Sequence, residues 1–267
     1  MTIRRVKKFR PGAVGIGSIP IILFLILPSL ALILRIHPSE FFPTLADPQA
    51  YEAIKLSIVT TFVTIIITVI AGTPAAYMLS RKRIPGRVII DTFLDLPIVL
   101  PPSVAGVALL VTFGRRGLLS PLLEQLHLDI AFTQVAVILA QLFVASPFYI
   151  KSAAAGFSAV DRDLEQAAAI DGASPFKVFR TVTLPLAFPA VAGGAVMTWA
   201  RALGEFGATI IFAGNFPGRT QTMPLAIYMG FEVDIKIALT LAFILLAVSF
   251  FILLVVKGLL HNKLSGF

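Results

Sequence analysis

The sequence predicts an all-α, polytopic membrane protein with six transmembrane helices and both termini in the cytoplasm. Three observations support this fold class: the composition, six long apolar segments, and the distribution of Lys and Arg. Apolar residues make up 57% of the 267-residue chain and charged residues 13%, about half the roughly 25% typical of soluble domains. The mean hydropathy is +0.93. A soluble domain of this size could not bury so much hydrocarbon, because small domains leave much of their surface in water.

Six segments are long enough to cross the hydrocarbon core, which needs about 20 mainly apolar residues. They are residues 14–34, 56–80, 95–114, 131–155, 186–212 and 237–257. The first follows a basic stretch like that of a signal peptide, but it is too long and no cleavage site follows, so we expect a retained helix. The expected organisation is a basic cytoplasmic N-terminus, a transmembrane domain and a cytoplasmic C-terminus, at residues 1–13, 14–258 and 259–267.

The basic residues orient the chain. Fifteen of the 22 Lys and Arg residues fall in segments that are cytoplasmic if the N-terminus is inside. Six fall in outside segments, and Arg201 lies within a span. An excess of basic residues in short loops marks the cytoplasmic side. The net charge of +8 is therefore explained by topology, and we expect no nucleic-acid partner.

Several kinds of chemistry have no residues to support them in the sequence. The chain has no Cys, and its three His residues do not have metal-ligand spacing. No phosphate-binding GxxxxGK[ST] motif occurs. An aspartyl enzyme within the membrane is disfavoured, because Asp91 and Asp95 lie on one helix near its cytosolic end. We expect no metal, no cofactor, no catalytic residue and no nucleotide site.

The cytoplasmic loop 156–185 has the pattern of two short helices joined at a glycine. Ser158 or Asp161 can cap the start of the first helix, because each side chain can accept a bond from an unpaired helix N–H. Gly172 supplies the left-handed residue that ends this helix. The first half of the loop therefore predicts a short helix followed by a sharp turn.

The second helix of the loop is expected to start at Ser174 and Pro175, because proline suits the first helical position. Leu184-Pro185 is expected to break the chain before the fifth span. Residues at a spacing of three form an apolar face on this second helix: Phe176, Phe179 and Val182.

Two interpretations of this amphipathic unit stay open from the residues alone. It could lie on the lipid headgroups as an interfacial helix. Alternatively, it could insert into a groove on a cytosolic partner and transmit motion. The small side chains of Ala167 and Ala168 favour the partner, because they let another surface come close.

The residues Gln166-Ala167-Ala168, Gly172 and Val182-Thr183-Leu184-Pro185 fit the spacing EAA-x3-G-x9-I-x-LP, with Gln and Val at the usual Glu and Ile. This pattern resembles the cytoplasmic motif of bacterial and archaeal ABC importer permeases, in which it forms a coupling helix that docks on the ATP-hydrolysing subunit. The resemblance implies that fold and this contact for twelve residues: Asp161, Leu164, Glu165, Gln166, Ala167, Ala168, Asp171, Gly172, Pro175, Phe176, Leu184 and Pro185. The change from Glu to Gln leaves open any salt bridge that the usual Glu makes.

Three further pieces resemble the permeases of molybdate and related oxyanion importers. They are DLPIVLPPSVAG (95–106), RALGEFGAT (201–209) and AGNFPGRTQTMPLAIY (213–228). Sulfate and thiosulfate permeases share much of the first two, whereas Thr220-Gln221-Thr222 in the third favours molybdate. The resemblance implies import of molybdate or tungstate, with sulfate or thiosulfate as the alternative.

Candidates for the translocation path or its gate lie in spans three and five. Arg201 and Glu205 are four residues apart, and we interpret them as a structural ion pair on one helix face, with an oxyanion contact as the alternative. Asp95 is expected to begin the third span near the inner interface, where it would serve as a gate, capping or packing group. Prolines should kink that span. The full candidate set is Asp95, Pro101, Pro102, Ser103, Arg201 and Glu205.

The resemblance also implies the partners and the mechanism. Two copies of the chain would form one path in a prokaryotic cell membrane, in contact with lipid, and two ATP-binding ABC subunits would bind the loops near 161–180. An extracytoplasmic oxyanion-binding protein would deliver the anion to the outer loops. A secondary transporter or channel is the alternative from another class, and it would move substrate without ATP.

Overall fold

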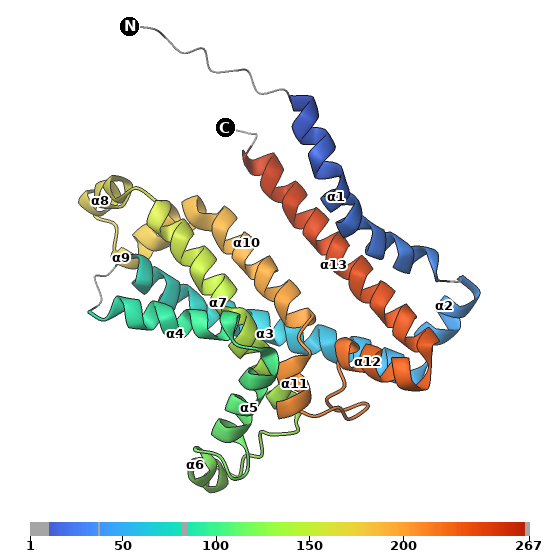
Figure 1. Ribbon diagram of the computed structural model, residues 1–267. Coiled ribbons are helices and arrows are strands. Elements are labelled where there is room, and N and C mark those ends of the chain that lie inside the picture. The colour runs from blue at the N-terminus through green and yellow to red at the C-terminus, as the bar shows by residue number, and fades with distance from the viewer. Residues whose placement is uncertain (1–10, 37, 82–84, 265–267) are drawn as a thin grey trace, which may run out of the picture.

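The computed structural model describes residues 11–36, 38–81 and 85–264, and within them the chain forms helices and no strands (Figure 1). Most of the predicted N-terminus and the last three residues lie outside this part. The helices are α1 (Pro11–Leu34), α2 (Pro38–Leu45), α3 (Pro48–Arg81), α4 (Arg87–Val99), α5 (Pro102–Phe113), α6 (Ser120–Gln125), α7 (Gln134–Ala159), α8 (Arg162–Ile170), α9 (Pro175–Val178), the π-helical turn η1 (Phe179–Thr183), α10 (Leu184–Leu203), α11 (Gly207–Phe212), α12 (Met223–Val233) and α13 (Ile235–Leu264).

The core of the molecule is α7, which packs along both α3 and α10. Small residues allow this close approach: a Cβ added at Gly194 of α10 would lie 2.7 Å from the Cβ of Ser152 on α7. Close packing of small residues is what holds helices together in lipid, where burying apolar surface gains little. Polar side chains add to it, because Thr64 donates to Gln141 Oε1 at 3.0 Å and Gln141 donates to Thr60 at 3.2 Å.

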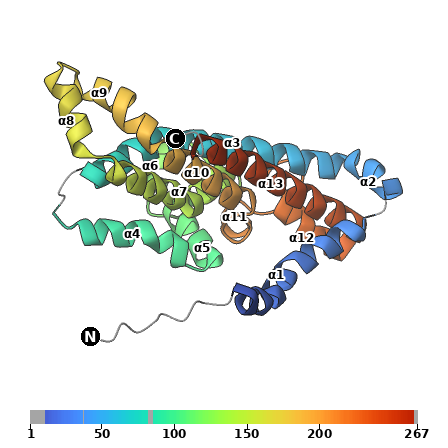
Figure 2. The same cartoon turned by 90° about the horizontal axis from the view of Figure 1, so that it is seen from above.

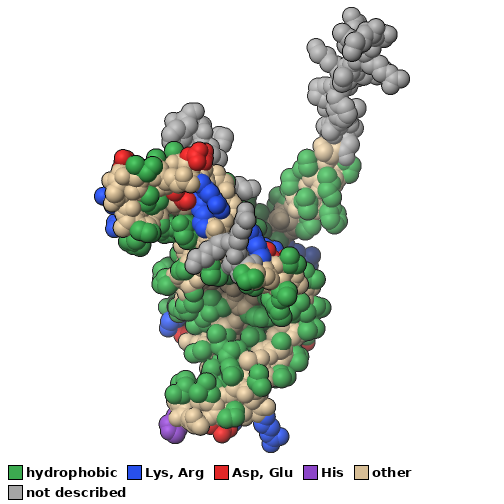
Figure 3. Space-filling view, turned by 90° about the vertical axis from the view of Figure 1, so that its left-hand side faces the viewer, with side chains coloured by type: hydrophobic (Ala, Val, Ile, Leu, Met, Phe, Trp, Pro, Cys, Tyr) green, Lys and Arg blue, Asp and Glu red, His purple; other side chains and the backbone are tan. Residues whose placement is uncertain are grey.

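Four helices in the described part are long and apolar enough to cross a membrane: Pro48–Arg81, Gln134–Ala159, Pro175–Leu203 and Ile235–Val256. The pair α4 and α5 would make a fifth if it is counted as one bent span. Residues 18–34 of α1 form a shorter apolar helix. Hydrophobic side chains cover most of the face shown in Figure 3. The all-helical membrane fold is confirmed, and the sixth span and the domain bounds stay predictions.

The third predicted span is broken. The axes of α4 and α5 differ by 115°, and the break falls at Leu100 and Pro101. Leu100 is extended, with ψ of 136°, because a following proline disfavours the helical region. The kink predicted from the prolines is confirmed. The prediction that Asp95 begins the span is wrong. The helix begins at Arg87 and places Asp95 in its second half.

The fifth predicted span also differs from a single helix over 186–212. The helix starts earlier, because Pro175 to Leu203 forms one continuous helical stretch through the π-helical turn. The break expected at Leu184-Pro185 is therefore wrong. The N–H of Leu184 bonds back to the carbonyl of Phe179, and Pro185 follows this wider turn, which lets the helix continue through the proline. The helix then ends at Leu203, and α11 follows after a break.

The remaining helices frame this core. Helix α13 packs against α12 and also contacts α1. In Figures 1 and 2, the start of α1 and the end of α13 both point toward the end of the bundle that carries α8 and α9.

The loop between α11 and α12 is fixed to α3 by side-chain hydrogen bonds. Gln49 Nε2 donates to Gln221 Oε1 at 2.9 Å, and the N–H of Met223 donates to Ser57 Oγ at 2.7 Å. Thr220, Gln221 and Thr222 are all buried. Gln221, one of the residues that favoured molybdate over sulfate in the sequence, therefore helps to hold this loop on α3.

Candidate functional site

The loop 156–185 folds as two helices with the predicted caps. Helix α7 continues to Ala159, so Ser158 lies inside it and the cap of α8 is Asp161, whose Oδ1 accepts the N–H of Asp163 at 3.0 Å. Gly172 has φ of +84° and turns the chain after α8. Ser174 caps α9 by accepting the N–H of Lys177 at 3.4 Å.

The exposed side chains of this unit differ from the predicted apolar face. Phe179 turns inward, where its ring lies 5.1 Å from that of Tyr77 and 5.8 Å from that of Phe157. The π-helical turn begins at Phe179 and closes its hydrogen bond over five residues, so the regular spacing of three does not continue from Phe179 to Val182. The apolar side chains that remain exposed come from both helices: Leu164, Ile170 and Phe176. Gln166, Ala167, Asp171, Gly172 and Pro175 are also exposed, whereas Ala168 and Leu184 are partly buried.

Glu165 is held inside the chain. Its Oε1 accepts bonds from Arg81 Nη2 at 2.7 Å and from Thr183 Oγ1 at 2.5 Å. Both Nη atoms of Arg81 also lie 3.3 Å from the carbonyl oxygen of Val160. Arg81 and Thr183 are not among the functional candidates predicted from the sequence, in which Arg81 is only one of several basic residues that orient the chain.

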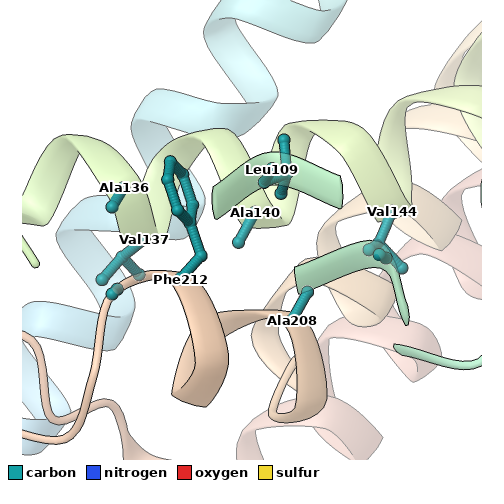
Figure 4. Close-up of a cluster of buried hydrophobic side chains, with 9 residues drawn as sticks. Leu109, Ala136, Val137, Ala140, Val144, Ala208 and Phe212 are labelled. Atoms are coloured by element: carbon teal, nitrogen blue, oxygen red, sulfur yellow. The ribbon is translucent and has the colours of Figure 1, made fainter. Parts of the chain in front are cut away.

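The breaks in the third and fifth predicted spans meet where Pro102 contacts Gly207, two residues after Glu205. Helix α5 packs on α11, and a Cβ at Gly207 would lie 2.6 Å from the Cβ of Pro102. Ala208 and Phe212 of α11 pack with Leu109 of α5 against α7 (Figure 4). Pro101, Pro102 and Ser103 are exposed beside this contact.

Arg201 and Glu205 form the predicted ion pair, with 2.7 Å between Arg201 Nη1 and Glu205 Oε2. Glu205 is 1% exposed and Arg201 30%. The prediction that Arg201 and Glu205 share one helix face is wrong, because α10 ends at Leu203 and Glu205 lies in the break before α11. The break also lets Glu205 cap the next helix. Its Oε1 accepts the N–H of Ala208 at 2.8 Å, which satisfies a free donor at the start of α11.

The ion pair of Asp95 involves neither Arg201 nor Glu205. It forms an ion pair with Lys151 of α7, and both side chains are a little over two-fifths exposed. Asp91 pairs instead with Arg87, one turn away on the same helix, at 3.4 Å. The ion pair with Lys151 joins α4 to α7, and the role of Asp95 as a gate, capping or packing group stays a prediction. Among the described residues, no cluster of His, Asp and Glu has the arrangement of a metal site.

The contact between the two helix breaks can be tested at Gly207. We expect Gly207→Val to separate α5 from α11 and to lower the yield of monodisperse protein, because overpacking typically costs about 1–3 kcal/mol. Size-exclusion chromatography in detergent measures this yield. Gly193→Val is the matched control, since a Cβ at Gly193 would have no atom within 4 Å. Equal yields from the two variants would show that the contact is unimportant.

Comparison with known proteins places this geometry in a family. Residues 68–264 match the family model described as "Binding-protein-dependent transport system inner membrane component". The molybdenum transport system permease protein ModB of Mycobacterium tuberculosis is 39% identical over 246 residues, which cover 91% of this chain and 92% of that protein.

The names of two other relatives include tungstate and sulfate. The molybdate/tungstate permease WtpB of Thermococcus kodakarensis is 37% identical over 220 residues, covering 82% of this chain and 83% of that protein. The sulfate permease CysW of Synechococcus elongatus is 32% identical over 266 residues, covering 98% and 93%.

Two crystal structures of a bacterial alginate ABC transporter share the fold at 18% identity. Their TM-scores are 0.74 and 0.70, with 94% and 92% of both chains covered. The second of them contains an alginate-bound periplasmic protein.

Proposed function

Because the chain belongs to the family of binding-protein-dependent transport system inner membrane components and is an ABC importer permease subunit, we propose that its cargo is molybdate or tungstate. The support for this cargo is the naming of relatives that are 37–39% identical over more than four-fifths of the chain. The chain makes and breaks no covalent bond in this role. It provides a path for a dianion that could not otherwise cross hydrocarbon.

The proposed coupling to ATP is carried by one observation, the unit formed by α8, Gly172 and α9. It has a capped start on each helix, a left-handed turn between them, and exposed apolar side chains. Such a rigid apolar projection suits a groove on a folded partner. Two ATP-binding subunits hydrolyse the nucleotide and bind one copy of this unit each.

The proposed mechanism is alternating access between two copies of the chain. ATP binding draws the two coupling loops together and opens the path outward, and hydrolysis resets it. An extracytoplasmic oxyanion-binding protein delivers the anion. In this scheme the chain has six spans in a prokaryotic cell membrane, with both termini and residues 156–185 in the cytoplasm.

The proposed path runs past the two helix breaks where α5 meets α11. Pro101, Pro102 and Ser103 lie exposed there, and the ion pair of Arg201 and Glu205 holds the second break in shape. We assign the pair a structural role, because each charge is neutralised by the other. The ion pair between Asp95 and Lys151 is the proposed gate group between α4 and α7.

Sulfate is the second candidate cargo, since CysW is similar along nearly the whole chain. The residues Thr220-Gln221-Thr222 are buried, and Gln221 is bonded to Gln49 of α3, so the choice between the anions does not rest on them. Molybdate is favoured because its relatives have the higher identity, 39% against 32%.

The cargo is tested by reconstituting the chain in vesicles with its ATPase and its binding protein. We expect ATP-dependent uptake of radiolabelled molybdate that a hundredfold excess of tungstate suppresses and the same excess of sulfate does not. Suppression by sulfate alone would assign the cargo to sulfate. Uptake that needs no ATP would favour a secondary transporter and refute the proposed coupling.

A further inference from the structure

Helix α8 is joined to the rest of the chain through a short non-helical connection at each end. Val160 and Asp161 separate it from α7, and residues 171–174 separate it from α9. Gly172 lies in the second connection with an open surrounding, since a Cβ there would meet no atom within 4 Å. The backbone alone would therefore let α8 rock about these two joints when a partner pulls on it.

The carboxylate of Glu165 ties α8 to α3 and to the π-helical turn, and through Arg81 to the end of α7. Arg81 stands at the C-terminal end of α3, Thr183 lies in the π-helical turn before α10, and both donate to the same oxygen, Oε1. Arg81 also reaches the carbonyl oxygen of Val160 at the end of α7. One acidic side chain of α8 is thus bonded directly to α3 and to the start of α10, and through Arg81 to the end of α7.

This contact is more shielded from water than the exposed ion pair of Arg87 and Asp91. The side chains of Arg81 and Glu165 are 11% and 15% exposed, whereas those of Arg87 and Asp91 are 52% and 42% exposed. A pair in a low-dielectric surrounding is little screened by salt. The Nε of Arg81 is buried without a hydrogen-bond partner, so removing Glu165 would leave a poorly compensated buried charge.

We propose that Arg81 and Thr183 are positioning residues that make α8 move as one body with α3, α7 and α10, so that motion at the ATPase reaches the path. This inference rests on the proposed coupling role of α8. Without these bonds, the apolar surface of Leu164 and Ile170 still binds the ATPase, but α8 rocks and the spans do not follow. The expected defect is therefore loss of coupling rather than loss of assembly.

The test uses the full complex of permease, ATPase and binding protein in lipid nanodiscs. We measure the ratio of ATPase activity with molybdate-loaded binding protein to activity without it. Arg81→Gln and Thr183→Val should each still co-purify with the ATPase. Both should lower this ratio, and Arg81→Gln should lower it about tenfold, because a shielded charge-assisted bond is lost. The control Arg87→Gln, in an exposed pair, should leave the ratio unchanged.

Exchange of the two charges separates positioning from a general structural role. Arg81→Glu and Glu165→Arg should each lower the ratio, and the two changes combined should restore part of it. Arg81→Lys should keep less of the ratio than this double variant, because lysine cannot reach both Glu165 Oε1 and the carbonyl oxygen of Val160. The chain has no Cys, so paired spin labels at Ser80 and Ala169 can report directly on rocking. Their distance distribution should broaden in Arg81→Gln.

The outcomes distinguish this inference from the proposed function. If molybdate-loaded binding protein does not stimulate the ATPase activity of the wild-type complex, the proposal that molybdate is the cargo is overturned. A stimulated wild type together with an equally stimulated Arg81→Gln would overturn the positioning role alone. If Arg81→Gln does not co-purify with the ATPase, the Thr183→Val variant tests the positioning role in its place. Full stimulation of ATPase activity in that variant overturns the inference as well.

Discussion

Replacing Gly172 with valine should abolish the stimulation of ATPase activity while the permease still inserts into the membrane. Gly172 has φ of +84°, a conformation that costs an ordinary L-residue about 1–2 kcal/mol and a β-branched residue more. A Cβ added here would have no atom within 4 Å, so the expected effect comes from the backbone conformation. The turn relaxes to a different geometry, and α8 no longer presents Leu164 and Ile170 in the direction that the partner requires.

The expected size of this effect is at least about tenfold in stimulated activity, because misplacing the contact removes coupling in every cycle. Two variants serve as controls. Gly172→Asn should keep most of the activity, since asparagine tolerates the left-handed region. Gly86→Val introduces the same strain at φ of +73°, also in open space but outside the loop, and should keep stimulation. Normal uptake by Gly172→Val would refute the coupling role of residues 156–185.

The features of the loop that the sequence predicted correctly are local. Asp161, Gly172, Ser174 and Pro175 each act on backbone groups within a few residues, so their type and order are enough to place two helices and a turn. The same local rule failed at Leu184-Pro185, because a π-helical turn let the helix continue through the proline.

The features that the sequence did not predict depend on distant contacts. Arg81 and Glu165 are 84 residues apart, and no periodicity connects them. The break at Glu205 lies inside a continuous apolar stretch, where hydropathy favours one long span. The break depends on the packing of α11 on α5 and on the buried carboxylate of Glu205, which accepts a backbone N–H at the start of α11. Packing of the whole chain, rather than local preference, determines both.

The second large effect is expected at Arg201. Arg201→Ala should strongly destabilise the protein, because it leaves Glu205, which is 1% exposed, without its counter-charge. Breaking a buried pair in this way typically costs about 3–5 kcal/mol, a large share of the stability of most domains. Thermal unfolding of the purified permease in detergent measures the loss. The exposed pair of Arg115 and Asp129 provides the control, and Arg115→Ala should change little.

A second substitution at Glu205 should restore the stability that Arg201→Ala removes. In Arg201→Ala with Glu205→Gln, the buried charge is gone while an oxygen still accepts the N–H of Ala208, so most of the stability should return. With Glu205→Ala the recovery should be smaller, because the start of α11 loses its acceptor. The transport activity of the Gln double variant then separates the two roles of Arg201. A stable variant that imports molybdate identifies the pair as structural, whereas a stable variant that does not import it would make Arg201 a contact of the passing anion.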